Sequence, residues 1–290
     1  MTTKAELFCD SRCELGEGPF WHPLKQRIFW FDILNRTLLS ADAAGHVVDR
    51  ITFQDTVSFA GVIDEHQLAV TQSHMLMRYD FRTDAQTPIV PIEADIKTNR
   101  TNDSRVDRAG NFWIGTMSRT AEQGAGAVYH YRRGAVQKII ADITIPNAIC
   151  FSPDGRWAYF TDAGAMIRKC ALDPETGTPI GAWQDFFAST EGLGWADGAV
   201  TDSEGFVWSA RWGGGKVLRI SPDGKLDRVI EVPVSNVSCP AFGGKDMKTL
   251  FLTTAREHLT PEQLEEQPTA GSLYAVEVDV PGLPEPMLTL

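Results

Sequence analysis

The feature of this sequence that most restricts its fold is a short strand-like pattern that occurs six times at similar intervals. Each copy is an apolar or aromatic run that follows a hydrophilic turn. The six runs are Ile28–Phe31, Gln67–Val70, Asn111–Ile114, Trp157–Phe160, Phe206–Ser209 and Thr249–Leu252. Their centres lie between 39 and 49 residues apart. A repeat of about 40–50 residues is typical of the four-stranded blades of a β-propeller.

The turns that precede these runs support the same interpretation. They are His22–Lys25, Asp64–His66, Asp107–Gly110, Ser152–Gly155, Asp202–Gly205 and Gly244–Asp246. Proline fixes φ at the first corner of a turn and glycine permits positive φ, so each segment predicts the hairpin between the first two strands of a blade. An N-terminal strand over Glu6–Cys9 is expected to complete the last blade and close the ring.

Helical periodicity is almost absent from the sequence. The clearest candidate for a helical turn is Thr260–Glu266, where Thr-Pro-Glu is typical of a helix N-terminus. The sequence therefore predicts an all-β protein, a six-bladed β-propeller with four antiparallel strands per blade, folded as a single domain over residues 1–290. Two β-sandwich domains are the main alternative, but no linker rich in Pro, Gly or Ser divides the chain and the repeat runs through its middle.

Charge and hydropathy exclude several classes of partner. The formal net charge is −11 and the longest basic run is Arg132–Arg133, so a nucleic acid backbone would be repelled. No apolar run approaches the roughly 20 residues of a membrane helix, and charged residues occur within Met1–Asp10 where a signal peptide is apolar. Five cysteines without a CxxC pair favour a reducing compartment. We therefore expect a cytoplasmic protein that binds neither nucleic acid nor membrane; nothing in the sequence specifies an oligomeric state.

Polar residues occupy one repeated position, 11 to 13 residues before the centre of a run. In four blades this position holds Glu17, Asn102, Asn147 and Asp197. In the other two it holds Ser58, and Pro240 beside Ser238 and Cys239. The first strand of each propeller blade lines the central channel, so side chains at this position should converge near one axis.

This set of residues predicts a metal site. Glu17 and Asp197 would repel each other in a partly desolvated channel, and a cation between them removes that conflict. Asn147 adds an amide oxygen, and an all-oxygen site suits calcium, magnesium or manganese and, less selectively, zinc or iron(II). The alternative is that these residues cap turns or form hydrogen bonds where the blades begin. Their matched positions in the repeat favour one divalent metal ion.

The same segments resemble the senescence marker protein/gluconolactonase/luciferin-regenerating family, also called the regucalcin family. The resemblance covers nearly the whole chain and rests on motifs in a fixed order: Leu15–Pro19 with Trp21, Arg100–Asp103, Pro146–Asn147, Asp197–Gly198 and Phe242–Gly244. It implies a six-bladed propeller with one divalent metal ion held by Glu17, Asn147 and Asp197. It also implies that Arg100 and Asn102 bind substrate, with Asn102 close to the metal.

Three positions depart from the usual motifs of that family. Ala148 stands where a glycine is common, Ala196 where a proline is common, and Ser104 where a glycine is common. These departures bear on loop shape and on the fit of a substrate more than on the metal.

The resemblance implies hydrolysis of a sugar lactone, a pentono- or hexonolactone of an oxidative sugar pathway. A metal ion can polarise the lactone carbonyl and activate a water, with Asp197 taking its proton and with Arg100 and Asn102 holding substrate oxygens. The sequence has no GxSxG motif, so a serine nucleophile is not expected. A non-catalytic calcium-binding regulator, a protein-interaction platform and a broader esterase are the alternatives.

Three segments are candidates for the rim that selects the sugar: Gln72–Met77, Ser118–Gly126 and Glu191–Trp195. Trp195 and Trp212 are available to pack against a sugar face, or else belong to the core.

Overall fold

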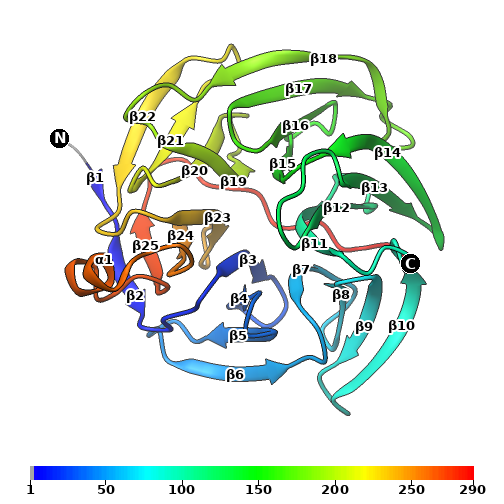
Figure 1. Ribbon diagram of the computed structural model, residues 1–290, viewed down its shortest axis with the longest axis horizontal. Coiled ribbons are helices and arrows are strands. Elements are labelled where there is room, and N and C mark those ends of the chain that lie inside the picture. The colour runs from blue at the N-terminus through cyan, green and yellow to red at the C-terminus, as the bar shows by residue number, and fades with distance from the viewer. Residues whose placement is uncertain (1–2) are drawn as a thin grey trace.

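A computed structural model describes residues 3–290 of the chain, and it has six four-stranded antiparallel blades around a central channel (Figure 1). Blade one contains β3 (Gly16–His22), β4 (Arg27–Asp32), β5 (Thr37–Ala41) and β6 (Val47–Thr52). Blade two contains β7 (Val57–Val62), β8 (Gln67–Gln72), β9 (Met75–Asp80) and β10 (Ala85–Pro91). Blade three contains β11 (Asn99–Val106), β12 (Phe112–Ser118), β13 (Gly126–Arg132) and β14 (Ala135–Ile143).

The remaining blades follow in chain order. Blade four contains β15 (Pro146–Phe151), β16 (Trp157–Asp162), β17 (Met166–Leu172) and β18 (Pro179–Ala188). Blade five contains β19 (Trp195–Thr201), β20 (Val207–Trp212), β21 (Lys216–Ile220) and β22 (Leu226–Glu231). Blade six contains β23 (Val237–Gly243), β24 (Thr249–Thr254), β25 (Leu273–Glu277) and β2 (Glu6–Cys9). The predicted six-bladed propeller is confirmed, and the six apolar runs fall on or overlap the second strand of each blade.

Both the ring closure and the short helix match their predictions. β2 pairs antiparallel with β25, so the N-terminal segment supplies the outer strand of blade six. β1 (Thr3–Lys4) adds to blade five by pairing parallel with β22. The helix α1 (Pro261–Glu266) begins with a capping box in which the Thr260 hydroxyl accepts from the Gln263 N–H and the Gln263 side chain accepts from the Thr260 N–H. In the described part of the chain no helix is long and apolar enough to cross a membrane.

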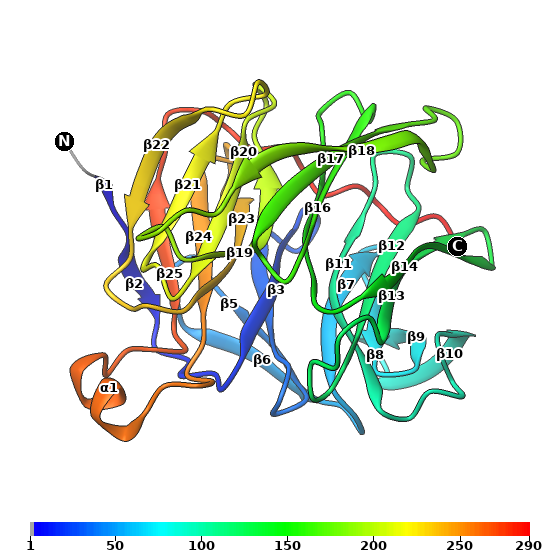
Figure 2. The same ribbon diagram turned by 45° about the horizontal axis from the view of Figure 1, so that its top comes forward.

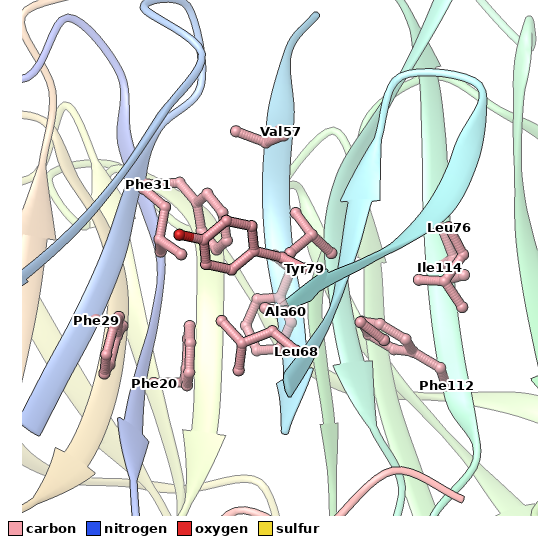
Figure 3. Close-up of a cluster of buried hydrophobic side chains, with 14 of the residues drawn as sticks. Phe20, Phe29, Phe31, Val57, Ala60, Leu68, Leu76, Tyr79, Phe112 and Ile114 are labelled. Atoms are coloured by element: carbon pink, nitrogen blue, oxygen red, sulfur yellow. The ribbon is translucent and has the colours of Figure 1, made fainter. Parts of the chain in front are cut away.

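The core lies between neighbouring blades. In blades one to three, apolar side chains from neighbouring sheets pack together, as the labelled Phe20 of blade one, Leu68 of blade two and Phe112 of blade three show (Figure 3). The Phe59 ring of blade two lies 6.2 Å from the ring of Phe20 and 6.1 Å from that of Phe112. Such pairs add to the burial energy of the apolar surface. They therefore hold the blades together at fixed angles.

The channel has two mouths that differ in construction. The innermost strands β3, β7, β11, β15, β19 and β23 all begin at one mouth, called here the first mouth. At the second mouth lie the turns between first and second strands, and the C-terminal tail, residues 278–290, passes across them (Figures 1 and 2). Backbone N–H groups of Gly282 and Leu288 donate to the carbonyls of Met247 and Val62, at 2.8 and 2.7 Å.

Every innermost strand contains a one-residue β-bulge close to the first mouth. The register with the second strand shifts between Glu17 and Phe20, Val57 and Phe59, Thr101 and Ser104, Asn147 and Cys150, Ala196 and Ala199, and Val237 and Cys239. A bulge bends a strand and re-aims a side chain. The polar positions predicted from the repeat therefore lie at or beside these bulges.

Two of the bulges need a left-handed residue. Gly18 has φ +54°, and a Cβ there would collide with the carbonyl oxygen of Ser58. Ala148 takes the corresponding place after Asn147 with φ +55°. The alanine at this position carries backbone strain that glycine avoids.

Deletion of residues 1–9 should lower the melting temperature by on the order of 10 °C or cause aggregation, because the edge of β25 loses its partner. Thermal unfolding followed by circular dichroism measures the change. Deletion of residues 1–4, which removes β1 only, is the control and should have a much smaller effect. Equal melting temperatures for the two deletions would contradict the assigned role of β2.

Replacement of Ala148 by valine should reduce the free energy of unfolding by about 2 kcal/mol or more, because a β-branched residue disfavours positive φ and the site is fully buried. The matched Ala148→Gly variant should stay within about 1 kcal/mol of the parent, since relief of strain is offset by chain entropy. Urea unfolding of both variants tests this. A valine variant as stable as the glycine variant would show that the strain is absent.

Candidate functional site

Residues from four blades meet near the first mouth. Glu17 lies on β3 of blade one, Arg100 and Asn102 on β11 of blade three, Asn147 on β15 of blade four and Asp197 on β19 of blade five. Each lies at or next to a bulge of an innermost strand, and these strands contact one another around the ring. The repeat thus brings together side chains that are far apart in the sequence.

The two asparagines are joined directly. Asn102 Nδ2 donates to Asn147 Oδ1 at 3.1 Å and to the Pro146 carbonyl at 2.9 Å. Arg100 Nη1 in turn donates to Asn102 Oδ1 at 2.8 Å and to the Thr101 carbonyl at 2.9 Å. Both asparagines are buried, so these hydrogen bonds hold their amide groups in one orientation. The structure brings Arg100, Asn102 and Asn147 into one network.

Among residues 3–290, no cationic side chain is bonded to the carboxylate of Glu17 or of Asp197. Asp197 is only 6% exposed, and in the described part of the chain its side chain makes no hydrogen bond or ion pair. Burial raises its pKa well above the ordinary value, and the charge of Glu17 raises it further. Burial, followed by the charge of Asp103, raises the pKa of Glu17 to about 8, although its Oε2 accepts the Gly18 N–H at 2.9 Å. The local charge favours a cation or a proton here.

The donor set fits a hard divalent cation. Two carboxylates and one amide oxygen, all at one mouth of the channel, are the ligand types that calcium, magnesium and manganese prefer. Among residues 3–290 no cluster of three or more His, Cys, Asp or Glu side chains has metal-binding geometry. Glu17, Asn147 and Asp197 are the residues that would hold such an ion.

The serines at the equivalent position have a different role. Ser58 Oγ donates to the Asn102 carbonyl at 2.7 Å, across the boundary between blades two and three. Ser238 Oγ bonds the Gly16 carbonyl and contacts Thr253 Oγ1 at 2.9 Å. Ser58 and Ser238 thus form hydrogen bonds where the blades begin, which was the alternative to a role in metal binding. The serines brace the strands that present Glu17 and Asn102.

Two charged residues that the sequence reasoning did not assign also lie in the channel. Burial raises the pKa of Asp103 to about 6, and its Oδ2 accepts the Ile149 N–H at 2.8 Å. Arg105 is 4% exposed and its positive charge lowers the pKa of Asp103. Asp103 follows Asn102 in the motif Arg100–Asp103, and Arg105 follows two residues later on the same strand. The sequence signal that could have identified these two residues is the alternation of side chains between the two faces of β11 beyond its bulge.

The rim of the first mouth includes the three predicted segments. Trp195 is 57% exposed and is not a core residue. It borders a cavity of about 390 Å³ that Ser189, Glu191 and Gly213 also line. The other two segments are linked through Arg119, whose Nη2 donates to Ser73 Oγ at 2.8 Å.

Comparison with known proteins places the chain in a family. Residues 15–256 match the family model described as SMP-30/Gluconolactonase/LRE-like region. The chain is 33% identical to a 6-deoxy-6-sulfogluconolactonase of Pseudomonas putida over 94% of both chains. It is 31% identical to an L-arabinolactonase of Azospirillum brasilense, covering 97% of this chain and 94% of the relative. The crystal structure of a calcium-binding protein, regucalcin, from Agrobacterium tumefaciens superposes over all of both chains with a TM-score of 0.96 at 37% identity. The chain therefore belongs to the SMP-30/gluconolactonase/LRE-like family.

Proposed function

We propose that this protein hydrolyses a sugar lactone to the aldonic acid in a reaction that requires one divalent metal ion held by Glu17, Asn147 and Asp197. The observation that carries the proposal is the pair of carboxylates at the first mouth, the buried Asp197 and the partly buried Glu17, to which no cationic side chain among residues 3–290 is bonded. The named relatives support the reaction class, because two of them are lactonases.

Different residues around the first mouth have different roles in ester hydrolysis. A bound divalent ion supplies Lewis acidity and lowers the pKa of a water. Asp197 orients the attacking water and accepts its proton, since its carboxylate lies at this mouth and no side chain of the described residues occupies its oxygens. Asn102 keeps Asn147 in place through their hydrogen bond of 3.1 Å.

Arg100 and Asn102 are the proposed substrate-binding residues. Arg100 bonds Thr101 and Asn102 through Nη1 alone within the described residues, so Nε and Nη2 remain to donate to lactone or hydroxyl oxygens. Trp195, exposed at the rim, offers an apolar face for a sugar ring. We infer a pentono- or hexonolactone of an oxidative sugar pathway as the substrate.

The ligand oxygens suit calcium, magnesium or manganese better than zinc or iron(II). The calcium-binding neighbour regucalcin also supports a second candidate function, that of a calcium-binding regulator without catalysis. Calcium binding without turnover of any lactone would favour that candidate.

Replacement of Asp197 by asparagine should reduce lactone turnover by about 100-fold or more, because the carboxylate that accepts the proton is lost. Proton release from glucono-1,5-lactone and from pentonolactones, with metal-stripped protein and one divalent ion restored at a time, measures the effect. Asp185→Asn is the matched control, since this surface aspartate pairs with Arg168 far from any buried charge. Undiminished turnover in the Asp197 variant would remove both its proposed roles.

Calcium affinity should rise with pH by up to about tenfold per unit until about pH 8, because the ion binds the ionised form of Glu17. The metal-free protein should lose stability over the same range. Its folded state keeps the Glu17 proton to about pH 8, whereas the unfolded chain releases it near the ordinary pKa of 4.5. Calorimetric calcium titrations and melting temperatures at several pH values test both trends.

Glu17→Gln is the control for this pH dependence. It should bind calcium weakly and reduce the pH dependence of the metal-free melting temperature. A calcium affinity of the parent protein that is unchanged between pH 6 and 8 would show that Glu17 is not a ligand.

A further inference from the structure

A buried ion pair lies in the channel between the candidate site and the second mouth. The Arg105 guanidinium, on β11, bonds Glu285 Oε1 at 2.5 Å, and both side chains are largely shielded from water. Arg105 also lies over the Phe59 ring of blade two, 5.2 Å from its centroid. Arg105 therefore joins the innermost strand of blade three to the C-terminal tail and packs against blade two.

Glu285 belongs to the C-terminal tail, and the tail is fixed on both sides of it. Before Glu285, the Gly282 N–H donates to the Met247 carbonyl in blade six, and a Cβ on Gly282 would collide with the ring of Phe242. After Glu285, Leu288 is buried in the core and its N–H donates to Val62 in blade two. The tail therefore crosses the second mouth in one defined position (Figure 2). Within it, the Glu285 carboxylate accepts from the Arg105 guanidinium.

The other neighbour of Arg105 leads to the candidate site. Arg105 lies two residues after Asp103 on β11, and Asp103 Oδ2 accepts the Ile149 N–H at 2.8 Å. Asp103 lies in the bulge of β11 next to Asn102, and Ile149 lies in the bulge of β15 that begins at Asn147. The two bulges that aim the asparagines are thus tied together by a carboxylate two residues before Arg105 on the same strand.

We propose that Glu285 and Arg105 are positioning residues for this site. The tail carboxylate holds the Arg105 guanidinium, and this ion pair anchors β11 two residues beyond Asp103. Asp103 in turn fixes the bulges from which Asn102 and Asn147 reach the first mouth. The inference deepens the proposed lactonase function and rests on it for its catalytic consequence. Its structural consequence, an effect of the C-terminal tail on metal affinity, stands on the contacts alone.

A merely structural role predicts a different behaviour. Buried ion pairs add little stability compared with apolar residues of similar size, whereas removal of one partner leaves an unpaired charge. A pair that serves only the fold can therefore be replaced by apolar side chains without loss. A positioning pair cannot, because β11 would lose the directional bond to the tail that anchors it next to its bulge.

The first test compares Glu285→Gln with Asp279→Asn. Asp279 is the matched control because it is also an acidic residue of the tail and pairs with an arginine, Arg228, but at the exposed surface. We expect Glu285→Gln to raise the calorimetric Kd for Ca²⁺ about tenfold or more and to lower kcat for glucono-1,5-lactone, as loss of a supporting residue around a metal site does. Asp279→Asn should leave both unchanged. Parent-like Ca²⁺ binding by Glu285→Gln would overturn the inference.

The double variant Arg105→Met/Glu285→Leu separates positioning from stability. We expect its melting temperature to approach that of the parent while its Ca²⁺ affinity stays reduced. Recovery of both would show that the pair serves only the fold. If the parent binds Ca²⁺ but hydrolyses no lactone, the proposed function fails and the Ca²⁺ titrations still decide the inference. If the parent neither binds Ca²⁺ nor hydrolyses a lactone, both fail.

Discussion

The candidate site depends on one backbone device, the bulge that each of the six innermost strands makes near the first mouth. A regular strand alternates its side chains between two faces, so the side chains of two consecutive residues cannot both point into the channel. The bulge adds a residue and changes this alternation locally. Asn102 and Asp103 are adjacent on β11, yet Asn102 contacts Asn147 while Asp103 contacts the backbone at Ile149. The same device at Ala148 carries a left-handed alanine.

Electrostatics in the channel follow from this packing. Glu17, Asp103 and Asp197 lie near one another in surroundings that exclude most water, and burial raises the pKa of each. Arg105 compensates part of this charge from the side of the second mouth. At the first mouth no cationic side chain bonds Glu17 or Asp197 in the described part of the chain. The uncompensated charge is therefore concentrated where a small ion and a substrate have access.

Two segments distant in sequence complete the ring. β2 adds the outer strand of blade six, and the C-terminal tail spans the second mouth from blade six to blade two. Each segment contacts blades that are formed by other parts of the chain, so the blades are joined by more than the aromatic contacts between neighbouring sheets. The ion pair of Glu285 with Arg105 shows that the tail also reaches the innermost strand of blade three.

The sequence by itself determined the fold class, the number of blades, the closing strand and the residues that converge on the first mouth. The repeat of turns and apolar runs predicts these features because each blade is built from the same local elements, strands joined by hairpin turns. The tertiary structure alone decided three contacts. They are the bracing hydrogen bonds of Ser58 and Ser238, the hydrogen bond of Asp103 with the backbone at Ile149, and the pairing of Arg105 with Glu285. These contacts join different blades, or a blade and the tail, at sequence separations that have no period. Only the closed ring brings such groups within a few ångströms of one another.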